Sequence, residues 1–227
     1  MERIRTFSGL FHLPTGHRKL DARAVESRIP YLDPRIMEQI HLYAEAGFGK
    51  EKEVGQLTRE EYVRDMVYGL SKSIKHPTEK EIQRMLVVDP RVKLEKQLEL
   101  FEIPHPDLNP ACVVNRSNIP EETSTPYTVI LCDLPYHCVP GERYSLYDLA
   151  HWITGFHMRG LTAMEGLIYL KLHPEFAREH VSHYFIGSEY GTGKFVMQTT
   201  NHLDQLELRS ELASVERRRD QVPITTI

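Results

Sequence analysis

The chain has 227 residues, of which 41% are hydrophobic and 26% are charged. This composition is that of a globular protein and excludes a disordered or fibrous chain. The net charge of −4 provides no general attraction to nucleic acid or to anionic membranes. The sequence contains no run of about 18 apolar residues, so it predicts no membrane-spanning helix.

Two further features favour a cytoplasmic location. The opening sequence, MERIRTFSGLFHLP, contains only a short apolar patch and lacks the pattern of a secretory signal. The three cysteines are too few for a disulfide framework, and an odd number fits a reducing compartment. We therefore expect a soluble cytoplasmic protein.

Charges and prolines divide the chain into three regions. Residues 1–102 are expected to be mainly helical, and 50–102 alone carry 22 charged side chains, 11 of each sign. Residues 103–126 contain five prolines, which predicts an irregular connector with a short buried strand at 111–115. Residues 127–227 carry fewer charges and are expected to form an α/β core unit with a polar C-terminal tail.

Four helix starts are expected in the first region. A side chain that accepts backbone N–H groups marks such a start, and threonine followed three positions later by glutamate forms a capping box. An apolar series follows each start, and the third helix is expected to extend through Leu86. The starts are Asp33-Pro34, Thr58 with Glu61, Thr78 with Glu81, and Asp89-Pro90, and Gly47 is expected to end the first helix.

Strand signals appear in the C-terminal region. Residues 127–132, YTVILC, are apolar and largely β-branched, which predicts a strand buried on both faces. Residues 184–187 and 194–199 are expected to form a β-hairpin. Residues 203–219 fit either a helix or a strand, and the arginine-rich end from Arg217 is expected to fray.

Two capping boxes predict helices between these strands. They are Ser145 with Asp148 and Thr162 with Glu165, and a further short helix is expected from Pro174. The patterns together predict an α+β or α/β fold. A helical N-terminal half is expected to precede a small mixed sheet with packed helices.

Cysteine and histidine approach metal-ligand spacing at one place, around Cys132, His137 and Cys138. Structural zinc sites space their paired ligands two to four residues apart and add a second pair downstream. Here five residues separate the two cysteines, and no second cysteine pair exists, although Cys112 and His183 are possible additions. Two cysteines at a strand end beside a loop histidine are the preferred interpretation, and we expect no metal or cofactor.

The segment Gly187–Gly193, GSEYGTG, has some features of a phosphate-binding loop. Such a loop needs four residues between its glycines and a hydroxyl residue after its lysine. In this chain five residues separate the glycines, and Phe195 follows Lys194. A hairpin turn is the preferred interpretation, and its exposed groups make Ser188, Tyr190 and Lys194 candidate ligand-binding residues.

A longer pattern begins at Arg159 and reads RGLTxxEG through Gly166, and Gly187-Ser188 follows 20 residues later. It resembles a pattern in a bacterial family of unknown function, over about residues 125–195. Glu189 stands where that family has an arginine after Gly-Ser. The resemblance implies a bacterial cytoplasmic protein and brings no established activity. Arg159 joins the candidate ligand-binding residues.

The sequence favours a non-catalytic binding or regulatory module over an enzyme, because each catalytic motif lacks a required residue. No G-x-S-x-G is present, for example. A metal-binding protein or metal-assisted hydrolase that uses Cys132, His137 and Cys138 is one alternative. An RNA- or ribosome-associated factor that uses the charged helices and residues 217–219 is another. We expect a protein or small-molecule partner rather than nucleic acid, and no membrane.

Metal analysis distinguishes the first alternative. We predict well under one zinc ion per chain in protein purified without a histidine tag. Replacement of both cysteines, Cys132→Ser with Cys138→Ser, is expected to leave the protein folded, whereas a structural zinc ion contributes on the order of 10 kcal/mol. Stoichiometric zinc, or unfolding on chelation, would contradict this prediction.

Overall fold

The computed structural model describes residues 33–71, 77–116, 125–133, 143–154, 158–174, 183–200, 205–212, 216–218 and 225–226. Six α-helices are present in these ranges: α2 (Pro34–Ala46), α3 (Arg59–Ser71), α4 (Glu79–Ile82), α5 (Leu94–Leu100), α6 (Leu146–Thr154) and α7 (Ala163–Leu172). Two 3-10 helices are η1 (Phe48–Lys50) and η2 (Pro110–Cys112). Within these ranges no helix is long and apolar enough to span a membrane.

The strands are β1 (Met85–Val88), β2 (Val113–Asn115), β3 (Tyr127–Ile130), β4 (Cys132–Asp133), β5 (Arg143–Ser145), β6 (His183–Tyr190), β7 (Lys194–Thr200), β8 (Leu206–Leu212), β9 (Glu216–Arg218) and β10 (Thr225–Thr226). Four of them form a sheet in the order β2-β6-β7-β8, and the others pair as β1-β3, β4-β10 and β5-β9. Every described pairing is antiparallel. Helices that precede antiparallel sheets confirm the predicted α+β fold.

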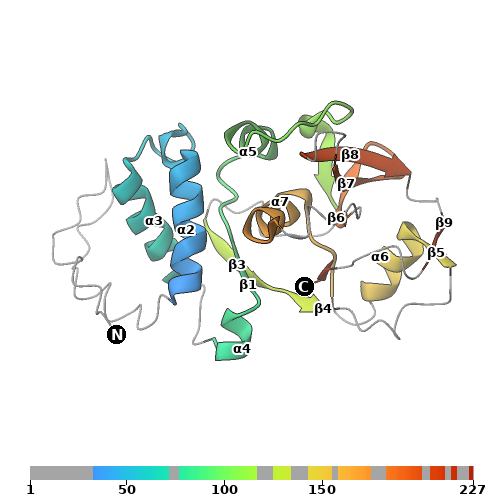
Figure 1. The fold of residues 1–227 in the computed structure, drawn as a ribbon, viewed down its shortest axis with the longest axis horizontal. Coiled ribbons are helices and arrows are strands. Elements are labelled where there is room, and N and C mark those ends of the chain that lie inside the picture. The colour runs from blue at the N-terminus through green and yellow to red at the C-terminus, as the bar shows by residue number, and fades with distance from the viewer. Residues whose placement is uncertain are drawn as a thin grey trace.

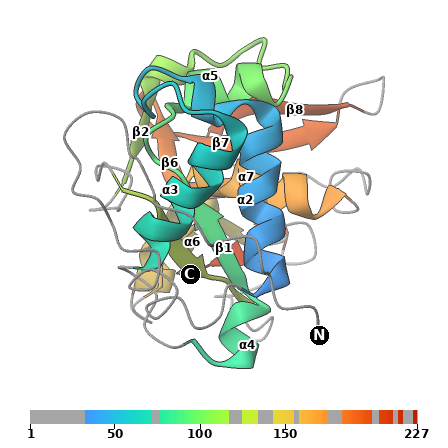
Figure 2. The same cartoon turned by 90° about the vertical axis from the view of Figure 1, so that its left-hand side faces the viewer.

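Helix α7 lies between the β1-β3 pair and the four-stranded sheet (Figure 1). It contacts β1 on one side and β6 on the other. Helices α2 and α3 cover the far side of the β1-β3 pair, and α6 contacts the far face of the four-stranded sheet (Figures 1 and 2). Because apolar partners surround it, α7 is apolar on nearly all sides, from Ala163 to Leu170.

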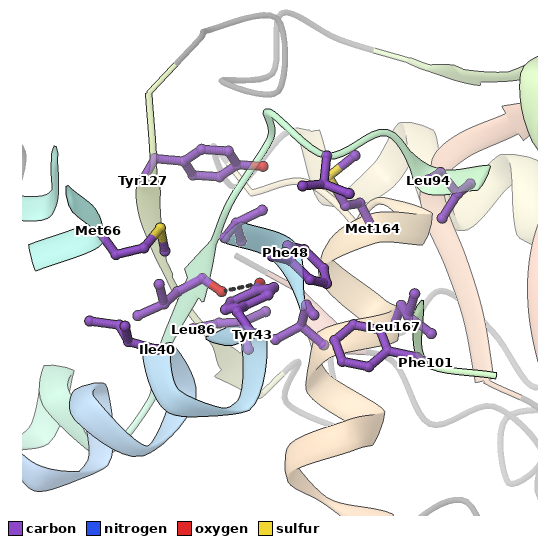
Figure 3. Packing of buried hydrophobic residues seen from close by; sticks show 14 of the residues in the cluster. Ile40, Tyr43, Phe48, Met66, Leu86, Leu94, Phe101, Tyr127, Met164 and Leu167 are labelled. Atoms are coloured by element: carbon purple, nitrogen blue, oxygen red, sulfur yellow. Dashed lines mark hydrogen bonds between the residues drawn. The ribbon is translucent and has the colours of Figure 1, made fainter. Parts of the chain in front are cut away.

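Side chains alternate across the four-stranded sheet, as the strand period requires. Phe185 and Val196 belong to the main core. Residues of α2, β1 and α7, such as Tyr43, Leu86 and Leu167, also belong to it (Figure 3). Ile186 and Phe195 point the other way, into a smaller cluster with α6. The main core therefore draws on both halves of the chain.

The predicted helix caps are present except the one at Asp89. The Asp33 carboxylate accepts a hydrogen bond from the Arg35 backbone N–H at 2.9 Å, and Gly47 ends α2 in the left-handed conformation at φ 94°. The four threonine or serine boxes also form, at Thr58, Thr78, Ser145 and Thr162. These local signals determine helix starts because a cap needs no distant partner.

The predicted end of one N-terminal helix and the predicted start of the next are wrong. Helix α4 ends at Ile82, and Met85–Val88 form the buried strand β1 where a helix through Leu86 was expected. Four consecutive apolar residues fit a strand covered on both faces as well as a helix, and α2 and α7 supply those covers. The helix expected at Asp89-Pro90 begins instead at Leu94, because the Asp89 carboxylate binds Arg91 in a turn before it.

Three strand predictions also need correction. Strand β3 is not buried on both faces, since Tyr127 and Val129 are buried whereas Ile130 is 37% exposed. The strand expected at 111–115 is β2 at the edge of the sheet, with Val114 exposed. The C-terminal segment forms strands β8 and β9, and β9 pairs with β5 where a frayed tail was expected. The helix expected after Pro174 lies outside the described residues.

A glutamine completes the edge of β1 that β3 does not cover. The Gln39 side-chain amide donates to the Met85 carbonyl and accepts from the Val87 N–H, both at 2.8 Å. The Tyr43 hydroxyl donates to the Val87 carbonyl at 2.8 Å. Helix α2 thus provides the hydrogen bonds that another strand would provide, which a buried strand edge requires.

This arrangement predicts a large cost for Gln39→Leu. The substitution removes both hydrogen bonds and leaves two buried backbone groups unpaired, at about 1–3 kcal/mol each. Chemical denaturation is expected to show a loss of about 2–5 kcal/mol in the free energy of unfolding. The control is Gln83→Leu, at the exposed residue directly after α4. It is expected to change the free energy of unfolding by less than about 0.5 kcal/mol. Equal effects of the two variants would contradict the edge role.

Candidate ligand-binding cleft

A cleft of about 490 Å³ lies where α5, η2, β2 and α7 approach one another. Its walls come from the segment 90–95, from η2, from one face of β2 and from the first turn of α7. Apolar side chains such as Leu94, Val113 and Met164 form much of the surface. The polar side chains are Arg91, Lys93, Glu95, Asn115 and Ser188. A cleft of this size with a few polar groups suits a small molecule.

Ser188 fixes one wall of the cleft to the start of α7. Its side chain is fully buried, and its hydroxyl accepts a hydrogen bond from the Ala163 N–H at 2.9 Å. The same hydroxyl donates to the Asn115 side-chain oxygen at 3.0 Å. Strand β6 thereby caps α7 and holds β2, so that Ser188 and Asn115 have defined positions in the cleft.

The start of α7 rests on a buried carboxylate. Glu165 is fully buried and receives both terminal nitrogens of Arg159, at 2.6 and 2.7 Å. It also accepts the Thr162 N–H at 2.8 Å and the Tyr127 hydroxyl at 3.1 Å. Multiple donors compensate the buried charge, and a bidentate guanidinium is the strongest of them.

The glycines of the same pattern allow close packing. A Cβ at Gly166 would lie 2.0 Å from the Phe185 ring, and one at Gly187 would lie 2.3 Å from the Gly160 carbonyl oxygen. Neither approach is possible for a larger residue. The pattern from Arg159 to Gly166, with Gly187 and Ser188, therefore joins α7 to β6 and β3.

A second buried ion-pair network lies behind the 90–95 wall. Asp89 is fully buried, and both its oxygens accept hydrogen bonds from Arg91, at 2.8 and 2.9 Å. Arg91 also pairs with Asp65, and the Tyr62 hydroxyl donates to Asp89 at 2.9 Å. Burial raises the pKa of Tyr62 well above its usual value, so the hydroxyl stays protonated as a donor.

The charged side chains that a ligand in the cleft can reach are not those of the Asp89–Arg91 network. Arg91 lines the cleft but is neutralised by Asp89 and Asp65. Lys93 is exposed at the rim, and among the described residues it has no ion-pair partner. Glu95 is also exposed at the rim. Among the described residues of its lining, the cleft thus offers the Lys93 cation and the Glu95 anion beside apolar side chains.

The structure separates the four candidate ligand-binding residues predicted from sequence. Ser188 lines the cleft, whereas Arg159 forms an ion pair with the buried Glu165. The Tyr190 hydroxyl accepts a hydrogen bond from the Asn109 N–H at 3.4 Å, so its ring is turned toward η2. Lys194 begins β7 after a turn in which Gly191 and Gly193 have positive φ. The predicted hairpin is present, but β6 extends through Tyr190 and the turn comprises only residues 191–193. The expectation that Ser188 is an exposed turn residue is therefore wrong, because Ser188 is fully buried within β6.

The proposed metal ligands are only partly described. The Cys132 backbone pairs with Thr226, and Cys112 is exposed in η2. His137 and Cys138 lie outside the described residues. Within the described ranges, no three histidine, cysteine, aspartate or glutamate side chains come together as a metal site.

Sequence reasoning did not find Arg91, Lys93 and Asn115 as cleft residues. Asp89-Pro90 has the pattern of a helix start, so Arg91 and Lys93 are expected on a solvated helix. Asn115 falls in the proline-rich region expected to be a connector. The position of Asn115 beside Ser188 depends on the pairing of β2 with β6, which is a long-range contact.

No family model, no curated protein and no solved structure matches the chain. The resemblance over residues 125–195 therefore stays a prediction. The structure gives its motif residues packing and capping contacts around α7.

Loss of the buried Arg159–Glu165 pair is expected to lower the free energy of unfolding more than loss of a surface pair does. Arg159→Met leaves the buried Glu165 carboxylate without its main partner, and the free energy of unfolding is expected to fall by about 3–5 kcal/mol. Arg59→Met removes an exposed pair with Glu45 and is expected to cost less than about 1 kcal/mol. Urea unfolding of both variants measures the difference. A cost for Arg159→Met no greater than that for Arg59→Met would contradict a structural role.

Proposed function

We propose that the protein is a non-catalytic, cytoplasmic binding module whose ligand is a small molecule held in the cleft between α5, η2, β2 and α7. The cleft itself carries the proposal, because it combines an apolar surface with a few polar groups in fixed positions. The buried bonds of Ser188 to Ala163 and Asn115 support this view. A site whose walls are already fixed loses little conformational entropy on binding.

The lining supports a particular ligand chemistry. Leu94, Val113 and Met164 favour an apolar body, and the Lys93 ammonium, which has no ion-pair partner within the described ranges, favours a carboxylate. Asn115 adds a polar side-chain amide whose position is fixed, because its oxygen accepts the Ser188 hydroxyl. A small aromatic or aliphatic carboxylate satisfies these groups together.

A panel of small carboxylates tests the proposal. The probes are benzoate, phenylacetate and indole-3-acetate, each compared with its neutral amide at millimolar concentration in a thermal unfolding assay. We expect at least one carboxylate to raise the melting temperature more than its amide, since a ligand that binds the folded state stabilises it. Lys93→Gln is expected to reduce that shift.

Steric block of the cleft provides the specific control. Ala111 lines the cleft and its side chain is exposed, so Ala111→Trp is expected to abolish the shift without unfolding the protein. Its neighbour Cys112 is exposed and lies outside the lining, so Cys112→Trp is expected to keep the shift. No shift across the panel, or an equal shift in Ala111→Trp, would overturn the proposal.

A further inference from the structure

Arg116 contacts two aromatic rings on the face of the sheet opposite the cleft. Its guanidinium carbon is 5.0 Å from the centroid of the Tyr147 ring and 5.0 Å from that of the Phe195 ring. Phe195 is fully buried in the cluster under α6, whereas Tyr147 is 53% exposed. Two cation–π contacts therefore hold the side chain at the protein surface.

The surface around Arg116 is apolar as well as aromatic. Arg116 directly follows strand β2, and Val114, two residues before it, is 61% exposed. Residues two apart in an extended segment share a face, which places Val114 and Arg116 on the same side of the sheet. Strand β2 is the edge strand of the four-stranded sheet.

No carboxylate among the described residues pairs with Arg116. Glu189 is the nearest acid in register, opposite Val114, and it forms no ion pair with Arg116. Asp148 accepts hydrogen bonds from Ser145, and Glu211 accepts the Tyr184 hydroxyl at 2.6 Å. The guanidinium charge is thus held in place without a counter-ion from these elements.

These ring contacts leave the N–H groups of the Arg116 guanidinium without a carboxylate partner among the described residues. Five N–H groups in a planar fork match the two oxygens of a carboxylate, and an arginine already held against two rings loses less conformational freedom on binding than a mobile one. The geometry at Arg116 therefore suits recognition of a carboxylate. Because this surface is not the cleft, a macromolecular partner fits it better than a small molecule.

We infer that Val114, Arg116 and Tyr147 form a docking surface for an extended acidic peptide segment of a partner protein. An apolar side chain of the segment contacts Val114, and an Asp or Glu two positions away binds Arg116 in bidentate fashion beside Tyr147. The charge of Arg116 complements the acid, and the edge position of β2 suits an extended chain. The net charge of −4 disfavours nucleic acid as the occupant.

Selection from a phage-displayed library of random linear peptides tests this inference with the full chain as bait. We expect enrichment of peptides with Asp or Glu two positions from an apolar residue. Fluorescence polarisation of an enriched peptide is expected to show at least tenfold weaker binding to Arg116→Gln, about 1.4 kcal/mol. Arg116→Lys is expected to weaken binding as well, because an ammonium has no planar fork. Arg59→Gln removes the same charge from α3 and is expected to leave binding unchanged.

Several outcomes would overturn the inference. These are failure to enrich acidic peptides, equal binding by Arg116→Gln, and full retention by Arg116→Lys. Binding of a labelled oligouridylate that depends on Arg116, without an acidic peptide motif, would assign the surface to nucleic acid instead. If Arg116→Gln melts well below the wild type, Tyr147→Ala replaces it, because Tyr147 is exposed. The same tenfold loss of peptide affinity is expected for this variant. The cleft variant Ala111→Trp is expected to bind the peptide normally, so the two sites are tested separately.

Discussion

The buried carboxylate of Glu165 is the interaction on which the rest of the structure depends. It lies in the first turn of α7, the helix between the β1-β3 pair and the four-stranded sheet. Its partners are Arg159, Thr162 and Tyr127, so one carboxylate joins the chain before α7, the helix cap and strand β3. A buried charge is tolerated only when hydrogen bonds replace its hydration, and this need fixes the three segments together.

The backbone groups on the edge of strand β1 also need hydrogen-bond partners in the core. Among the described strands, only β3 pairs with β1, and Gln39 and Tyr43 of α2 complete its other edge. These two sets of hydrogen bonds connect α2 to β1 and α7 to β3. The cleft forms where α7 meets β2 and the 90–95 segment, and Ser188 links α7 to β2.

Strand β2 has a different role on each of its faces. Val113 and Asn115 line the cleft, whereas Val114 and the following Arg116 belong to the surface beside Tyr147. The alternation of side chains in a strand makes this separation unavoidable. A short edge strand thus contributes to both proposed binding surfaces.

The sequence by itself determined the helix caps, the hairpin and the α+β class, because a cap or turn depends on residues three or four positions apart. It also marked Arg159, Glu165 and Ser188 as parts of one pattern, although it did not reveal that their bonds are structural. Tertiary structure decided that Met85–Val88 is a strand, since the choice depends on covers supplied by α2 and α7. It also decided the cleft and the Arg116 surface, because both form from segments brought together by pairing of β2 with β6, more than 70 positions apart in the chain.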